Sequence, residues 1–336
     1  MKERQDEGEF HFHRSNIHES SNRPERDGPG EGIPELKQAH PTIEFVHCAD
    51  RQALANAIAD ADIYMGHLSR EVFLAAKKLQ WVQSPSSGVN YFLAIPELKD
   101  GPVILTGARG THAASVADSA MAMILAITRG IRDSIQAQPE HKWVASVRQN
   151  LVELTDLTMG VIGLGSIGKA LAKRAFAFDM RIVAVELFPN NKPEYVHELW
   201  GLDRLNNLLA ESDIVVVTVP WTPEVQGMIG AEQIARMKPS AMLVGMSRGG
   251  IIDQQALAEA LREKRIASAA LDVFEPEPLP ADSELWDIEN LLIAPHIAGG
   301  TQYEGKYLLD IFGENLAKFV AGEFPLRNQI NKQLGF

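Results

Sequence analysis

Residues 159–174 read MGVIGLGSIGKALAKR, in which Gly163, Gly165 and Gly168 have the spacing G-x-G-x-x-G. The stretch opens with apolar residues that predict a strand and continues as an amphipathic pattern that predicts a helix. In that context the first glycine makes a tight turn, the second lets a ligand approach the backbone, and the third lets helix and strand pack closely. Because a helix N-terminus carries free N–H groups and partial positive charge, the stretch predicts a pyrophosphate site.

A carboxylate follows this motif at the spacing expected for a dinucleotide site. The next apolar run, RIVAVE, ends in Glu186, 18 residues after Gly168, where an acid accepts hydrogen bonds from an adenosine ribose. The same carboxylate would repel the 2′-phosphate of NADP, so we expect NAD or NADH rather than NADP. Arg181 and Lys192 are nearby cations that could soften this preference. The predicted cofactor contacts also include Ser166, Ile167 and Pro220.

Strand and helix patterns alternate along both halves of the chain. In the second half the runs MGVIG, RIVAVE, DIVVVTVP, AMLVGMS, IASAALD and NLLIAP are continuously apolar, which indicates a parallel sheet covered on both faces. Shorter apolar runs alternate with helical patterns from Ile33 to Thr106. The sequence therefore predicts an α/β protein with two doubly wound parallel-sheet domains.

Residues 1–32 differ from the rest in being polar, charged and dotted with glycine. We expect this segment to be mobile, apart from a candidate short strand at EFHFH. His11, His13 and His18 lie in the segment, but no cysteine or carboxylate completes a recognisable ligand spacing, and no metal site is predicted.

The composition narrows the class of protein and its partners. The 336 residues, 45% hydrophobic, suffice for roughly two domains. A formal charge of -12 disfavours binding to nucleic acid or to an anionic membrane. The single cysteine, Cys48, suits a reducing compartment, and no apolar stretch has the form of a signal peptide or a spanning helix. We expect a cytoplasmic protein.

Four chemical groups follow strands of the second half, at the edge where parallel strands end together. Arg248 follows AMLVGM, Asp272 and Glu277 follow IASAA, and His296 follows NLLIAP. Histidine suits proton transfer near neutral pH, and a carboxylate behind it stabilises the imidazolium. Arginine binds a carboxylate through two parallel hydrogen bonds. These groups are what a nicotinamide-dependent enzyme needs to reduce a 2-keto acid.

Several of these residues have alternative interpretations. Asp272 could instead cap a helix or bond a loop. His112 lies beside Arg109, but it is expected to start a helix rather than to catalyse. Met65 and His67, in YMGHLS, could line the mouth of a substrate site.

The ordered motifs GVIGLGSIG, SRGGIID, LDVFEPEPLP and APHIAGGT resemble those of the D-isomer-specific 2-hydroxyacid dehydrogenases, which include glyoxylate/hydroxypyruvate reductases. The resemblance runs from about Ile33 to the end. It implies that Arg248 binds substrate, that His296 transfers the proton, and that Glu277 is its partner. Asp272 resembles the family aspartate that contacts the nicotinamide carboxamide.

The resemblance also implies a substrate site and a domain organisation. In SPSSGVNYF, Gly88 and Val89 match residues whose backbone N–H groups receive the substrate carboxylate, and Ser87 is assigned to the same site. The family inserts an NAD-binding Rossmann domain into a discontinuous, flavodoxin-like substrate domain. The predicted domains are accordingly 33–107 with 299–336 for substrate, and 108–298 for NAD.

The family usually pairs through its coenzyme domains. We therefore expect a homodimer in which residues 116–131, VADSAMAMILAITRGI, bury apolar area against the second copy. The predicted activity is NAD-dependent interconversion of a small 2-keto acid and the D-2-hydroxy acid. The alternative is an NADH-responsive protein-binding scaffold, because the C-terminal binding protein corepressors resemble this family and keep its active-site residues. Formate dehydrogenases share the fold, but their pattern has Gln rather than Glu beside the histidine. Glu277 therefore argues against a formate dehydrogenase. The chain departs from the family at Gly245, often Asn, and at Trp221.

Overall fold

The computed structural model describes residues 10–15, 33–48 and 50–335, and it divides into two compact units. One unit comprises the described residues up to Thr111 together with those from Thr301. The other runs from His112 to Gly300. The chain therefore passes between the units twice.

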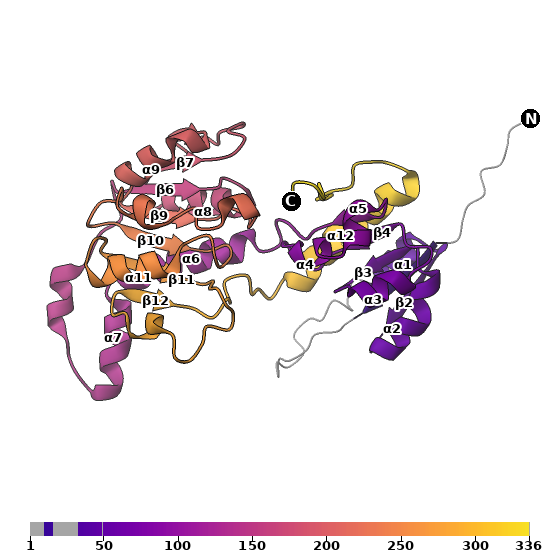
Figure 1. Ribbon diagram of the computed structural model, residues 1–336, viewed down its shortest axis with the longest axis horizontal. Helices are drawn as coiled ribbons and strands as arrows, with labels where there is room; N and C mark the ends of the chain where they lie inside the picture. The colour runs from indigo at the N-terminus through magenta and orange to yellow at the C-terminus, as the bar shows by residue number, and fades with distance from the viewer. Residues whose placement is uncertain (1–9, 16–32, 49, 336) are drawn as a thin grey trace, which may run out of the picture. The chain divides into compact units, whose positions relative to one another are not determined.

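The unit from His112 to Gly300 is built on a seven-stranded parallel sheet in the order β12-β11-β10-β9-β6-β7-β8 (Figure 1). Numbered from β6 along the chain, this order contains 3-2-1-4-5-6, the Rossmann order. The strands are β6 Thr158–Ile162, β7 Arg181–Val185, β8 Glu198–Trp200, β9 Ile214–Val217, β10 Met242–Gly245, β11 Ser268–Leu271 and β12 Leu291–Ile293.

Helices cover both faces of this sheet. Along β9 the side chains alternate, so that Val215 packs with Leu208 and Leu257 in one core cluster, while Val216 packs with Ile124 and Leu171 in the other. The prediction of a sheet buried on both faces is confirmed. The helices are α6 Ala113–Thr128, α7 Ile131–Ala137, α8 Ser166–Phe176, α9 Leu205–Glu211, α10 Ala231–Ile234 and α11 Gln254–Arg262, with short 3₁₀ turns at Gln138–Glu140, Ala145–Asn150, Leu202–Arg204, Pro223–Val225 and Glu284–Asp287.

The other unit contains a five-stranded parallel sheet in the order β2-β1-β3-β4-β5, which is the flavodoxin-like order. Its strands are β1 Phe10–Ser15, β2 Ile43–Cys48, β3 Ile63–Met65, β4 Trp81–Gln83 and β5 Ile104–Thr106. Its helices are α1 Ile33–Ala39, α2 Arg51–Ala57, α3 Arg70–Ala75, α4 Asn90–Leu93, α5 Pro96–Asp100 and α12 Glu304–Ala321, with a 3₁₀ turn at Ile58–Asp60.

The C-terminal helix α12 belongs to this first unit, as the discontinuous fold requires. Its Leu316 and Phe312 are buried in one cluster with Ile63 and Trp81, and the Phe312 ring stacks on Trp81 with centroids 5.2 Å apart. The fold predicted from the sequence, a Rossmann domain inserted into a flavodoxin-like one, is confirmed.

Strand β1 confirms the candidate short strand at EFHFH, and the prediction that the rest of residues 1–32 is mobile falls on residues outside the described ones. Residues 10–15 pair in parallel with both β2 and β3, so they lie inside the sheet. The alternation of phenylalanine and histidine from Phe10 to His13 has the period of a strand, and sheet pairing outweighs the charged composition around it. His18 and the side chains of His11 and His13 lie outside the described residues.

Within the part of the chain that the structure describes, no single helix has the length and apolar character to cross a membrane. The bent pair Ala113–Thr128 and Ile131–Glu140 meets these criteria only when its two segments are counted together.

Candidate active site

The glycine loop has the geometry of a phosphate cradle. Gly163 has φ +93, and a Cβ there would lie 2.8 Å from a methyl group of Val219. A Cβ at Gly168 would overlap the carbonyl oxygen of Gly163, so α8 packs closely on the turn only because the residue is glycine. At Gly165 no heavy atom lies within 4 Å of a Cβ position. The backbone at Gly165 is therefore open to a ligand.

Helix α8 begins at this open point. Gly165 is the N-cap, no side chain caps the helix, and the first intrahelical bond runs from the Lys169 N–H to the Gly165 carbonyl at 2.9 Å. The N–H groups of Ser166 and Ile167 precede that bond and belong to the first turn, where an anion is bound best. These features fit the pyrophosphate of a dinucleotide.

Thr218 supports the same loop and was missed by the sequence analysis. Its Oγ1 donates to the Gly163 carbonyl at 2.6 Å and lies 3.2 Å from the Ile162 carbonyl. The only signal in the sequence is its place near the end of an apolar run. Pro220, two residues further on, is exposed beyond the end of β9, at the edge where the glycine loop leaves β6.

Glu186 follows β7 and lies against the glycine loop. Its Oε2 accepts the Leu164 N–H at 2.7 Å, and its Oε1 accepts the Leu187 N–H at 2.9 Å. The two cations considered above bond elsewhere. Arg181 stands at the opposite end of β7 and pairs with Glu211 at 3.2 Å, while Lys192 donates to the Val196 carbonyl at 2.6 Å.

His296 and Glu277 are brought together as the sequence predicts. His296 Nδ1 lies 2.6 Å from Glu277 Oε2, and Glu277 Oε1 accepts the Phe274 N–H at 2.8 Å. Their side chains keep 43% and 34% of their surface exposed, respectively, so a substrate can reach the imidazole. With Nδ1 on the carboxylate, Nε2 is the atom left for a substrate.

Asp272 holds the backbone that carries His296. The residue is 3% exposed, and its two carboxylate oxygens accept the N–H groups of Ile297 and Ala298 at 2.9 and 3.0 Å. Burial raises the pKa of the Asp272 carboxyl above its ordinary value, and these two N–H groups oppose the rise. The alternative interpretation as a loop hydrogen-bonder is therefore realised.

Arg248 lies in the loop after β10, near Glu277. Burial lowers the pKa of its guanidinium and the charge of Glu277 opposes this, but an arginine stays protonated in either case. The guanidinium donates to the Ser247 carbonyl at 2.7 Å. A Cβ at Gly249 would overlap the carbonyl of Phe274, so the Arg248 loop and the Glu277 loop are in close contact.

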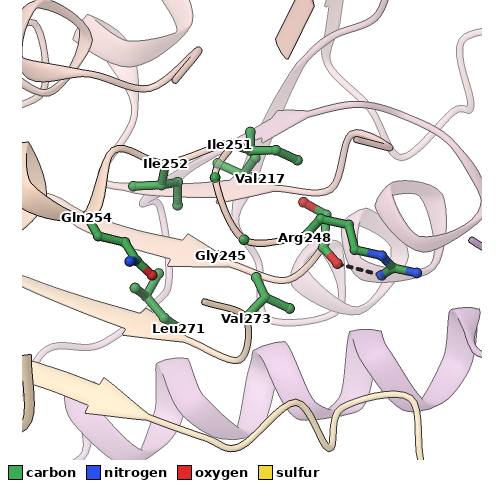
Figure 2. A pocket seen from close by; sticks show the side chains of 11 residues that line it. Val217, Gly245, Arg248, Ile251, Ile252, Gln254, Leu271 and Val273 are labelled. Carbon is green, nitrogen blue, oxygen red and sulfur yellow. Dashed lines mark hydrogen bonds between the residues drawn. The ribbon is translucent and has the colours of Figure 1, made fainter. Parts of the chain in front are cut away.

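Figure 2 shows a pocket at the carboxyl ends of β9, β10 and β11, bounded by the Arg248 loop. The Arg248 side chain extends away from Ile252 and Leu271, which line the other end of the pocket. Gly245 lies between Ile252 and Leu271, and a Cβ there would come within 2.8 Å of Leu271 and 3.0 Å of Ile252. At position 245, where the family often has Asn, these two side chains thus leave no room for a Cβ. Trp221, the other position at which the chain departs from the family, is half-buried and packs against the core cluster that contains Ile252 and Leu271.

The predicted substrate residues lie in the other unit, in the loop after β4. Ser87 Oγ donates to the Ala108 carbonyl at 3.0 Å, and Val89 is buried where α4 begins. Met65 is buried in the core, so the interpretation that it lines a substrate mouth is wrong. His67 is exposed, with its ring centroid 5.5 Å from that of Tyr91.

No group of three or more His, Cys, Asp or Glu residues that could hold a metal ion occurs among the residues that the structure describes. The unit from His112 to Gly300 thus contains a phosphate cradle at the glycine loop, the His296–Glu277 pair and Arg248.

A family model for the NAD-binding domain of D-isomer specific 2-hydroxyacid dehydrogenases matches residues 121–298. The chain belongs to this family. A glyoxylate reductase of Korarchaeum cryptofilum is 35% identical over 293 residues, which are 84% of this chain and 87% of that protein. A hydroxypyruvate reductase of Blautia hydrogenotrophica is 33% identical, over 84% of this chain and 89% of that protein.

Solved structures of D-2-hydroxyacid dehydrogenases resemble the whole chain. A crystal structure of the enzyme from Xanthobacter autotrophicus, in complex with NADPH and MES, has a TM-score of 0.81 and 27% identity, covering 98% of this chain and all of that one. The prediction of a D-2-hydroxyacid dehydrogenase, an oxidoreductase with a Rossmann NAD-binding domain, is confirmed.

Proposed function

We propose that this dehydrogenase uses NADH to reduce small 2-keto acids, of the size of glyoxylate and hydroxypyruvate, to the D-2-hydroxy acids, and that it catalyses the reverse oxidation. The observation that carries the proposal is the 2.6 Å contact between His296 and Glu277 in the same unit as the glycine loop and Arg248. The names of the two reductases above support the choice of substrate class.

Each residue has a defined part in this reaction. The bound nicotinamide cofactor supplies or accepts the hydride at the substrate C2 carbon. His296 protonates the carbonyl oxygen during reduction and removes the hydroxyl proton during oxidation. Glu277 stabilises the imidazolium and holds its Nδ1. Arg248 polarises the carbonyl and binds the carboxylate.

The preference for NAD over NADP rests on Glu186. Its carboxylate lies beside the glycine loop, where it would accept the ribose hydroxyls and repel a 2′-phosphate. Arg181 and Lys192 make other bonds, which removes the two cations that could offset it. The NADPH complex of the Xanthobacter enzyme makes this preference worth measuring directly.

We also propose a cytoplasmic homodimer that binds neither nucleic acid nor membranes. For the pairing surface we propose a segment other than residues 116–131. The apolar residues of α6, such as Met121 and Ile124, are buried inside their own unit. Exposed apolar side chains gather instead on α7 and the segment after it, which project from the sheet and its helices as an arm (Figure 1). These residues are Ile131, Ile135, Trp143, Val144 and Val152, and Trp143 is 96% exposed.

A panel of 2-keto acids assayed with NADH and with NADPH tests the function. We expect NADH-dependent reduction of at least one two- or three-carbon 2-keto acid, with the D-product identified by chiral chromatography. If the protein turns over none of these acids, the proposal is overturned. If the protein then still binds NADH in calorimetry, the scaffold alternative is favoured.

A further inference from the structure

The loop from His296 to Gly300 is held from two sides. On one side Asp272 accepts the N–H groups of Ile297 and Ala298. On the other side the beginning of α6 bonds the carbonyl groups. His112 Nδ1 and Ser115 Oγ each lie 3.0 Å from the Gly299 carbonyl oxygen. Further along α6, Ser119 Oγ lies 3.4 Å from the Ala298 carbonyl.

The His112 side chain is not used as a helix cap. His112 occupies the N-cap position of α6, yet its side chain makes no capping bond. Because a carbonyl oxygen only accepts, Nδ1 carries the proton in the bond to Gly299. The ring also packs on Gly299, since a Cβ there would lie 3.6 Å from its Cγ and Nδ1.

Ser115 shares the same acceptor. Its single hydroxyl proton lies between the carbonyl of His112, at 3.1 Å, and that of Gly299, at 3.0 Å. The Gly299 carbonyl is thus bonded by two side chains at the beginning of α6, His112 and Ser115, a pair that we name the Gly299 latch.

The latch matters because of the backbone of His296. This residue has φ +52, in the left-handed region, which residues other than glycine rarely adopt. Such a conformation persists only where the neighbouring chain is fixed. Asp272 fixes the two residues after His296, and the latch fixes the next.

The latch also joins the two ends of the unit. His112 is its first residue, and Gly299 and Gly300 are its last two. Without the latch, the chain beyond Ala298 would lose its attachment to α6 just before it leaves the unit.

We propose that His112 and Ser115 are positioning residues of the reductase, which hold the Gly299 carbonyl and thereby fix the direction of the His296 imidazole. This inference rests on the proposed function of His296. It assigns His112 a task that neither catalysis nor helix capping accounts for.

Kinetics of four variants test the proposal: His112→Ala, His112→Asn, Ser115→Ala and the double variant His112→Ala/Ser115→Ala. The amide nitrogen of asparagine can take the place of imidazole Nδ1. We expect the double variant to lose about tenfold in kcat, because small displacements of a catalytic group are costly, with NADH affinity unchanged. The primary isotope effect with NADH deuterated at the transferred position should rise, and His112→Asn should recover most of the rate. Equal losses in His112→Ala and His112→Asn, or an unchanged kcat in the double variant, would overturn the proposal.

Hydrogen–deuterium exchange separates this proposal from the proposed function. The Ile297 and Ala298 amides should exchange faster in the double variant than in wild type, while peptides of α8 should not change. His47→Ala, an exposed histidine of the other unit, is the control. If wild type reduces no 2-keto acid, the proposed function fails, and unchanged exchange in the double variant would still overturn the latch. If the His112 variants do not fold, the kinetics and exchange of Ser115→Ala alone test the proposal.

Discussion

Glu277 uses both carboxylate oxygens, one on His296 Nδ1 at 2.6 Å and the other on the Phe274 N–H at 2.8 Å. The second bond fixes the carboxylate, so the first fixes the ring of His296. A carboxylate in this position holds the ring in one orientation and stabilises the charge that it carries during proton transfer. Reduction needs the imidazolium, and oxidation needs the neutral ring.

The turnover of Glu277→Gln tests this relationship. Glutamine keeps the shape but removes the charge that stabilises the imidazolium during proton transfer, so turnover should fall by at least about tenfold in both directions, with NADH affinity unchanged. The measurement is kcat for reduction and for oxidation, with Glu259→Gln on the exposed face of α11 as the control. Equal turnover of wild type and Glu277→Gln would show that Glu277 does not act on His296.

His296→Asn should lower turnover by at least about a hundredfold, the lower end for loss of general acid–base catalysis. NADH affinity should stay nearly intact, because the glycine loop and Glu186 bind the cofactor on other elements of the unit. Stopped-flow single-turnover rates and calorimetric NADH titrations measure the two effects separately. A loss of less than tenfold would remove His296 from the proton-transfer step.

Arg248→Lys should lower kcat/KM for every accepted keto acid by about a hundredfold. The ammonium keeps the charge but cannot form two parallel bonds to a carboxylate, and misplacement of the substrate by an ångström has an effect of this size. Arg262→Lys, in an exposed ion pair with Glu284, is the matched control and should be silent. Unchanged turnover of several keto acids by Arg248→Lys would place Arg248 outside the site.

The sequence predicts those parts of the site that local chemistry specifies. The spacing of Gly163 and Gly168 follows from a single turn in which an added Cβ would overlap backbone or a methyl group. Continuous apolar strands predict the parallel sheet, and the sheet places Arg248, Glu277 and His296 in loops at one edge. The alternating pattern of EFHFH predicts strand β1 in spite of the charged composition around it.

Contacts between distant residues could not be read in the same way. The His112 to Gly299 bond joins residues 187 positions apart, and neither residue belongs to a motif that specifies the other. The buried face of α6 and the exposed residues of α7 are both apolar in sequence. Only the packing of α6 against α8 and β6 shows which of them is free to meet another molecule.

The exposed arm predicts which substitutions would break the proposed homodimer. Ile135→Glu combined with Trp143→Glu should convert a dimer to a monomer, because it places charges in an apolar surface that pairing would bury. Multi-angle light scattering at micromolar concentration measures the mass. Leu74→Glu, an exposed apolar residue of the other unit, should leave the dimer intact. A monomeric wild type would refute the dimer itself, and a dimeric double variant would refute this surface.

Glu186→Arg should reverse the cofactor preference. In wild type the carboxylate beside the Leu164 N–H repels a 2′-phosphate, so NADH should have the higher kcat/KM. Arginine replaces that repulsion with a cation able to bind the phosphate, whereas Glu186→Ala removes the repulsion alone. We therefore expect the NADPH to NADH ratio of kcat/KM to rise from wild type to Glu186→Ala and again to Glu186→Arg, with keto-acid KM little changed. A wild type that prefers NADPH severalfold, or a ratio that is the same in all three proteins, would show that Glu186 does not face the ribose.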